Sequence, residues 1–136
     1  LFFDSKPKQK YCCQSGKVEP YVRALRTVDV WITGLRRDHS EARGETPKVS
    51  LVQEEWGPIL KLAPLAEWDE RQVREYIAEH DVPMNPLYDQ GYTSIGCVIC
   101  STPTQPWEKK RAGRWRWFNH LDDDKECGIH TQGSGI

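Results

Sequence analysis

The sequence predicts an α/β fold, because runs with the pattern of strands occur together with segments of helical spacing. Residues 28–33 are β-branched and apolar, so we expect a buried strand that ends at a glycine. Residues 49–52 and 59–62 are two further short apolar runs. Residues 69–80 place their apolar side chains on one helical face. A buried strand and helices in one short chain indicate an α/β architecture.

The N-terminal part is predicted to begin as a loop and to continue as a helix. Residues 1–10 are polar and rich in lysine after the opening aromatic residues, so we expect a loop that enters the domain. Apolar residues recur at helical spacing in 17–25, where Pro20 fits only in the first turn. Residues 35–48, after the first strand, are charged and contain glycine and proline, so we expect another loop.

The middle of the chain contains the clearest helix. Residues 69–80 begin at Asp69, which is a good N-cap, and Gln72 completes a capping box three residues later. This helix should end near residue 81, before Pro83. The two short apolar runs that precede it are separated by Trp-Gly-Pro, and they form either a hairpin or strand ends in a larger sheet.

The last third of the chain is predicted to be irregular. Residues 83–106 are rich in proline, glycine, asparagine and serine. Residues 115–118 suggest a short strand or an extended segment. We expect 119–136 to be a mobile C-terminal segment, and its last residues, 131–136, are flexible by composition.

Length and composition bound the class of protein. The chain has 136 residues, 38% of them hydrophobic and 29% charged, with a net charge of -1. This balance argues against a disordered tail or a general nucleic-acid binder. No apolar run approaches the ~20 residues that cross a bilayer, and no signal peptide opens the sequence, so we expect a cytoplasmic protein with no membrane partner. Because the sequence opens on Leu1, we expect 1–136 to be a single, truncated domain.

The cysteines suggest a metal site. Five cysteines without a secretory signal argue against a disulfide framework. Cys12 and Cys13 are adjacent, and Cys97 and Cys100 form a CxxC pair. Adjacent thiolates splay apart and suit a cluster with several irons, whereas zinc prefers spaced ligands. The pattern alone ranks an iron–sulfur cluster first, zinc a close second and a catalytic dithiol third, and cysteines buried without a ligand are the plainer alternative.

Several motifs follow one another along nearly the whole chain. They are Cys12-Cys13 with KVEP at 17–20, WITGLRR at 31–37 with Ser40 and Arg43, Trp68-Asp69, NPLYDQGY at 85–92, Cys97 with Cys100, RAGRW at 111–115 and KECGIH at 125–130. In this order they resemble the PAPS/APS reductase family, and specifically its cluster-containing APS reductase branch. PAPS reductases share the ECG-x-H end but lack the two cysteine pairs.

The resemblance implies a particular fold. The chain would be the C-terminal part of an adenine-nucleotide α-hydrolase-like fold, which is built on a parallel sheet. The first half of the family carries an SGGKDS-like loop that cradles the nucleotide, and this sequence contains no such segment. We therefore expect an incomplete sheet.

The resemblance also implies an activity and a cofactor. The thiolate of Cys127 would attack the sulfur of adenylyl sulfate (APS), AMP would leave, and an S-sulfocysteine would form. Thioredoxin or glutaredoxin would then release sulfite, as a step of sulfate assimilation. One [4Fe-4S] cluster would be bound by Cys12, Cys13, Cys97 and Cys100, with an electrostatic and structural role.

Seven basic residues are implied to bind the substrate, since planar guanidinium groups suit phosphate and sulfate oxygens. They are Lys17, Arg36, Arg37, Arg43, Arg111, Arg114 and His130. The plainer alternative for each is an exposed, solvated side chain. The other three histidines, His39, His80 and His120, have no such context, and we interpret them as structural or exposed.

Two alternative functions stay open. The first is an enzyme of the same family that uses PAPS, because contacts to the 3' position of the ribose would lie in the half that this sequence lacks. The second is a zinc- or cluster-binding module without catalysis, which the missing nucleotide loop favours.

Overall fold

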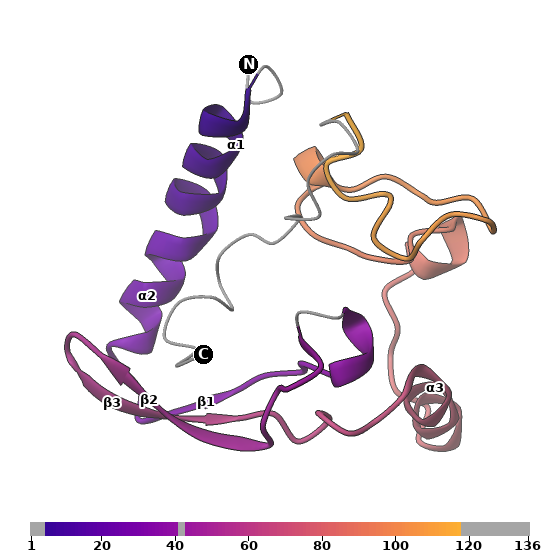
Figure 1. The fold of residues 1–136 in the computed structure, drawn as a ribbon. Helices are drawn as coiled ribbons and strands as arrows, with labels where there is room; N and C mark the ends of the chain where they lie inside the picture. Colours follow the sequence, from indigo (N-terminus) through magenta and orange to yellow (C-terminus); the bar gives the residue numbers. More distant parts are fainter. Residues whose placement is uncertain (1–4, 41–42, 118–136) are drawn as a thin grey trace.

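The computed structural model describes residues 5–40 and 43–117. A helical rod, α1 with α2, rises from one end of a small sheet, and α3 lies at the other end (Figure 1). Residues 83–117, called the irregular segment below, follow α3 and lie across from α1 in this view. The predicted segment 119–136 lies outside the described residues, with Cys127, His130 and His120. None of the described helices is long and apolar enough to span a membrane.

The N-terminal rod is one continuous helical run. It consists of α1 (Lys6–Cys13), a π-helical turn (Gln14–Val18) and α2 (Glu19–Leu25). The prediction of a loop over 1–10 is therefore wrong from Lys6 onward, because Pro7 lies in the first turn, where its missing N–H costs nothing. Pro20 lies in the first turn of α2, directly after the π-helical turn. The wider turn accommodates a residue that cannot donate a helical hydrogen bond.

The sheet contains three strands in the order β1-β3-β2. They are β1 (Val30–Ile32), β2 (Val49–Glu54) and β3 (Gly57–Leu62). β2 and β3 form the hairpin that was one of the two alternatives, and Gly57 supplies the positive φ of 127° at the turn. β1 pairs with β3 in parallel. The α/β class is confirmed, but the sheet is mixed rather than parallel, because so short a turn permits only an antiparallel pair.

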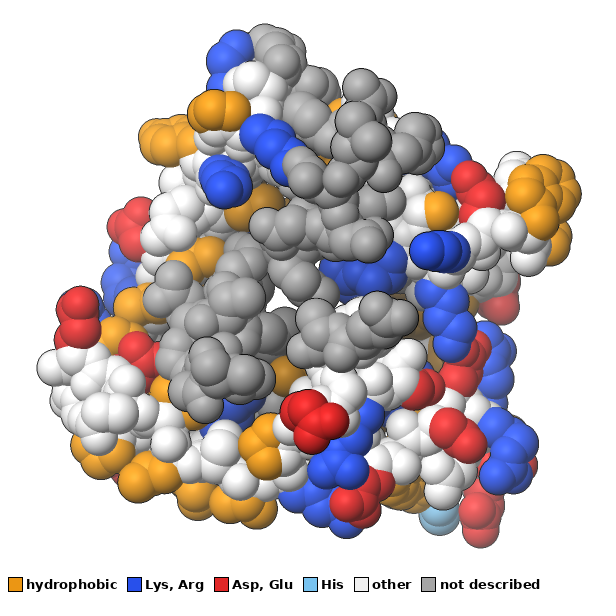
Figure 2. Space-filling model, in the orientation of Figure 1, with side chains coloured by type: hydrophobic (Ala, Val, Ile, Leu, Met, Phe, Trp, Pro, Cys, Tyr) orange, Lys and Arg blue, Asp and Glu red, His pale blue; other side chains and the backbone are white. Residues whose placement is uncertain are grey.

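One face of the sheet carries the main core. Leu25 of α2 packs with Trp31, Val52 and Ile59, and Tyr21 meets Trp31 edge to face at 5.2 Å between ring centroids. The opposite face is different, since Ile32 is 68% exposed and Val30, Val49 and Leu51 are also exposed. Figure 2 shows hydrophobic side chains along the lower edge, where the sheet lies.

The expectation that 28–33 is buried therefore holds for Trp31 and Thr33 but is wrong for Val28, Val30 and Ile32. The reason is that α2 covers only one of the two faces between which strand side chains alternate. A small second core of Leu35, Ala63 and Ala66 joins the chain after β1 to the chain after β3.

Helix α3 (Glu70–Glu79) has the predicted capping box. Gln72 N–H donates to Asp69 Oδ1 at 2.7 Å, and Asp69 N–H donates to Gln72 Oε1 at 2.9 Å. Asp81 has a φ of 50°, so the helix ends before Pro83, close to the predicted position.

The irregular segment is held by short-range pairing instead of regular structure. It contains 3₁₀ turns at Tyr88–Gln90 and Val98–Cys100. Ser101 forms an isolated antiparallel bridge with Arg114, and Trp115 N–H donates to the Cys100 carbonyl at 3.0 Å. Trp115 has a φ of 46° and lies in a turn, so the extended conformation predicted for 115–118 is wrong for its described residues.

Candidate anion-binding site

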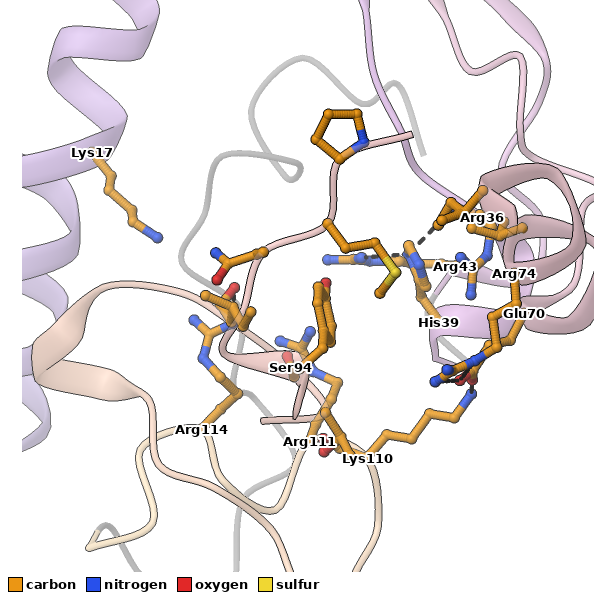
Figure 3. Close-up of a pocket in the computed structure, with 18 residues that line it drawn as sticks. Lys17, Arg36, His39, Arg43, Glu70, Arg74, Ser94, Lys110, Arg111 and Arg114 are labelled. Atoms are coloured by element: carbon orange, nitrogen blue, oxygen red, sulfur yellow. Dashed lines mark hydrogen bonds and ion pairs between the residues drawn. The ribbon is translucent and has the colours of Figure 1, made fainter. Parts of the chain in front are cut away.

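A cavity of about 530 Å³ lies where four parts of the chain meet. Lys17 reaches it from the helical rod, and α3 and the loop after β1 contribute further charged side chains (Figure 3). The irregular segment supplies the remaining charged groups. Among residues 5–40 and 43–117, the lining includes seven cationic side chains, Lys17, Arg36, Arg43, Arg74, Lys110, Arg111 and Arg114, and one carboxylate, Glu70. Such a cavity has a strongly positive potential and favours an anionic ligand.

The structure brings five of the seven predicted substrate-binding residues together. Lys17, Arg36, Arg43, Arg111 and Arg114 all line the cavity, although they come from three separate parts of the sequence. Arg37 is not among the lining residues. Its Nε donates to the Thr46 carbonyl at 3.0 Å, and its Nη1 lies 3.6 Å from Glu67 Oε1. His130 lies beyond the described part of the chain.

Arg36 is held in place by a carboxylate two residues away. Its Nε and Nη2 donate to the two carboxylate oxygens of Asp38 at 2.8 and 3.0 Å, and the Arg36 side chain is 12% exposed. The hydrogen bond from Arg36 lowers the pKa of Asp38 below its ordinary value. Asp38 therefore orients Arg36 and also cancels part of its charge.

His39 is a cavity residue that the sequence reasoning missed. Its Nδ1 lies 3.3 Å from Arg43 Nη1 and 3.4 Å from the backbone nitrogen of Arg36. Burial lowers the pKa of His39 to about 4, and the nearby guanidinium groups of Arg36 and Arg43 act in the same direction. One signal in the sequence pointed to the site, because His39 follows Arg36 and Arg37 and precedes Arg43.

Glu70 and Lys110 join α3 to the irregular segment. They form an ion pair, and Glu70 Oε1 also accepts from Arg74 Nη2 at 2.8 Å. The hydrogen bonds from Lys110 and Arg74 lower the pKa of Glu70. The sequence reasoning assigned none of these three residues to a site. Lys110 lies in a stretch, 109–116, that is dense in basic residues, but its pairing with Glu70, 40 residues away, has no local signal.

Arg114 lies between the cavity and one cysteine pair. Its side chain is buried, and its Nη2 donates to Cys100 Sγ at 3.4 Å. Gly96 makes this approach possible, since a Cβ there would overlap the Arg114 guanidinium and lie 2.9 Å from Cys100 Sγ. Cys100 thus accepts a hydrogen bond from a side chain that also lines the cavity.

The four cysteines of the predicted cluster are not brought into one site. Cys12 and Cys13 are partly buried on α1, while Cys97 is exposed and Cys100 is buried. Within 5–40 and 43–117, no three metal-ligating side chains converge. Four thiols in two pairs have the donor chemistry of a [4Fe-4S] cluster. The four thiols are thus suitable ligands for such a cluster, but their positions in the structure do not form a binding site. Cluster binding stays a prediction.

The fold and the cavity define an α/β protein with a preformed cationic site suited to phosphate or sulfate oxygens. The family model of the phosphoadenosine phosphosulfate reductase domain matches residues 3–103. The chain therefore belongs to this family, and the predicted resemblance is confirmed.

Proteins named adenosine 5'-phosphosulfate reductase are among its relatives. The chain is 43% identical over 130 residues to one from Rhizobium tropici, covering 96% of this chain and 70% of that protein. It is 46% identical over 129 residues to one from Burkholderia cepacia, covering 95% of this chain and 50% of the relative. It is 44% identical over 134 residues to one from Allochromatium vinosum, again covering 50% of the relative. The chain thus spans about half the length of the Burkholderia cepacia and Allochromatium vinosum proteins and a larger part of the Rhizobium tropici protein.

The chain is also similar to solved structures, of which two are described here. A phosphoadenylyl-sulfate (PAPS) reductase from Candida auris, in a phosphate complex, has a TM-score of 0.57 and 38% identity, covering 74% of this chain and 46% of that one. An FMN adenylyltransferase from Candida glabrata has a TM-score of 0.51 and 15% identity, covering 79% of this chain and 40% of that one. At this identity the similarity supports the fold alone.

Proposed function

We propose that the complete protein reduces adenylyl sulfate to sulfite and AMP. The observation that carries this proposal is the convergence of Lys17, Arg36, Arg43, Arg111 and Arg114 on one cavity. The names of the three relatives described above, at 43–46% identity, support the same activity.

The charge of the cavity matches the phosphosulfate end of this substrate. Phosphate and sulfate each carry negative oxygens, and guanidinium groups bind such oxygens with two parallel hydrogen bonds. The cavity volume of about 530 Å³ is in the range of small-ligand sites. A ligand with two adjacent anionic groups suits seven cations and one carboxylate better than a neutral ligand would.

The proposed chemistry is a sulfur transfer to Cys127. Its thiolate forms an S–S bond to the sulfur of the sulfate group, the S–O bond to phosphate breaks, and AMP leaves with the electron pair of that bond. A thiol of thioredoxin or glutaredoxin then attacks Cys127 Sγ and expels sulfite. The second thiol of the reductant resolves the mixed disulfide and regenerates Cys127, so that the dithiol is oxidised by two electrons.

In this proposal the basic residues bind and orient the anion while the thiolate approaches. Lys125 and His130, which flank Cys127 in the sequence, favour its ionisation, and Glu126 opposes it. Thiol reductants of this kind are kept reduced in the cytoplasm, which is the compartment we propose.

We further propose that Cys12, Cys13, Cys97 and Cys100 hold a [4Fe-4S] cluster in the complete protein. The donor chemistry supports this, although the four side chains do not converge among the described residues. When bound, such a cluster would supply a fixed charge distribution near the anion site. Arg114 is placed to respond to it, since it contacts Cys100 and lines the cavity.

A mass measurement tests the proposed reaction. The full-length protein is treated with APS without a thiol reductant, and its intact mass should increase by one SO₃ group. Cys127→Ser should show no increase, and Glu75→Gln, an exposed substitution on α3 outside the described cavity lining, is the control that should still form the adduct. An adduct on Cys127→Ser would show that a different residue accepts the sulfur.

A PAPS-using enzyme remains the second candidate. It is favoured by the similarity to the PAPS reductase from Candida auris, at 38% identity. Turnover of the two nucleotides under the same conditions separates the candidates, and we expect faster turnover of APS.

A further inference from the structure

We infer that His39 is a positioning residue that holds the Arg43 guanidinium toward the anion without itself adding a negative charge beside it. This inference rests on the proposed function, since it specifies how the same cavity binds an oxyanion.

The geometry determines the protonation state of His39. Both groups near its Nδ1, the guanidinium of Arg43 and the backbone N–H of Arg36, are donors only. Nδ1 must therefore accept, and it cannot carry a proton while both contacts exist. The proton of the ring then lies on Nε2, and the imidazole is neutral.

The comparison with Arg36 shows why a neutral acceptor matters. Asp38 holds Arg36 through two hydrogen bonds but also brings a negative charge to within 3.0 Å of the guanidinium. The His39 ring holds Arg43 without such a charge. An arginine that must attract an anionic ligand keeps more of its attraction beside a neutral partner than beside a carboxylate.

The surroundings keep His39 neutral at ordinary pH. Arg36 and Asp38 face it from its own turn, Arg43 from the following loop and Arg111 from the irregular segment. Three of these four groups are cations, and together with burial they hold the pKa of His39 at about 4. A protonated His39 would be repelled by these three cations, so the neutral form of its ring dominates above about pH 5.

Three substitutions in the full-length protein separate orientation from charge. His39→Asn places an amide oxygen near the position of Nδ1 and should keep phosphate affinity within about twofold. His39→Leu removes the acceptor, keeps the bulk, and should weaken inorganic phosphate binding about tenfold. His39→Asp supplies a charged acceptor and should also weaken binding, because it cancels charge. His80→Leu, at the residue that follows α3 and outside the described cavity lining, is the control.

The readouts are calorimetric phosphate affinity and the ¹⁵N spectrum of the ring. We expect His39 to show a protonated Nε2 and an unprotonated Nδ1 from pH 8 to pH 5.5. The inference is overturned if His39→Leu binds phosphate like the wild type, if His39→Asn binds as weakly as His39→Leu, or if the ring titrates near pH 6.5.

These outcomes are independent of the proposed reaction. Failure of the protein to reduce APS would contradict the proposed function but leave the phosphate measurements interpretable. Normal APS turnover by His39→Leu, with unchanged KM, would contradict the role of His39 alone.

Discussion

Arg114 and Cys100 are linked by a hydrogen bond of 3.4 Å from the guanidinium Nη2 to the sulfur. The same arginine lines the cationic cavity, so one buried side chain connects a predicted anion site with a predicted cluster ligand. A change in the charge of this sulfur, by ionisation or by metal binding, should therefore be felt by a ligand in the cavity.

Gly96→Ala should disrupt this link. The added Cβ would overlap the Arg114 guanidinium, so Arg114 or the backbone must move. Crowding of this kind costs about 1–3 kcal/mol of unfolding free energy, and phosphate affinity should fall as well. Chemical denaturation and calorimetry of the full-length protein measure the two effects.

Gly16→Ala is the matched control for this change. Gly16 lies in the helical rod with no atom within 4 Å of an added Cβ, so the substitution should be neutral or stabilise by about 0.5–1 kcal/mol. Equal effects of the two substitutions would contradict the crowding argument.

Asp38→Asn should destabilise the protein in a pH-dependent way. The pKa of Asp38 in the folded protein is below its ordinary value, so the stabilisation is complete above the ordinary pKa. It is lost as the pH falls through the folded value. We expect a difference of about 1 kcal/mol at pH 7 that shrinks below about pH 4. Urea denaturation at several pH values checks this, with the exposed Asp89→Asn as control, and a constant difference would argue against the pair.

Glu70→Gln should strengthen anion binding. Glu70 is the one carboxylate among the described residues that line the cavity, so its neutralisation raises the positive potential there. Phosphate affinity should rise about two- to fivefold at low ionic strength and less at high salt. Glu75→Gln, which loses an exposed pair with Arg71 on the same helix, should leave affinity unchanged. Weaker phosphate binding by Glu70→Gln would mean that the ion pair of Glu70 with Lys110 contributes more to the affinity than the negative charge of Glu70 takes away.

Cys97→Ser should lower the iron content of the full-length protein, whereas Cys127→Ser should keep it. The reason is that Cys97 belongs to the CxxC pair, while Cys127 belongs to neither pair. Iron analysis and the absorbance of thiolate-to-iron charge transfer measure this. Normal iron in Cys97→Ser would remove Cys97 from the ligand set.

Local signals in the sequence were sufficient for several elements. The capping box of Asp69 and Gln72 specified the start of α3, because both hydrogen bonds form between residues three apart. The rod was harder to predict, since Pro7 and several lysines resemble a loop until the helix is continued through a π-helical turn.

The sequence by itself determined the family, the α/β class and the chemical types at the site, because these depend on motifs of neighbouring residues. Only the tertiary structure decided which side chains meet. It brought Lys17, Arg43 and Arg114 to one cavity and turned Arg37 toward Thr46 and Glu67. It also placed His39 against Arg43. Such contacts depend on how the loop after β1 and the irregular segment pack, and local periodicity contains no information about that packing.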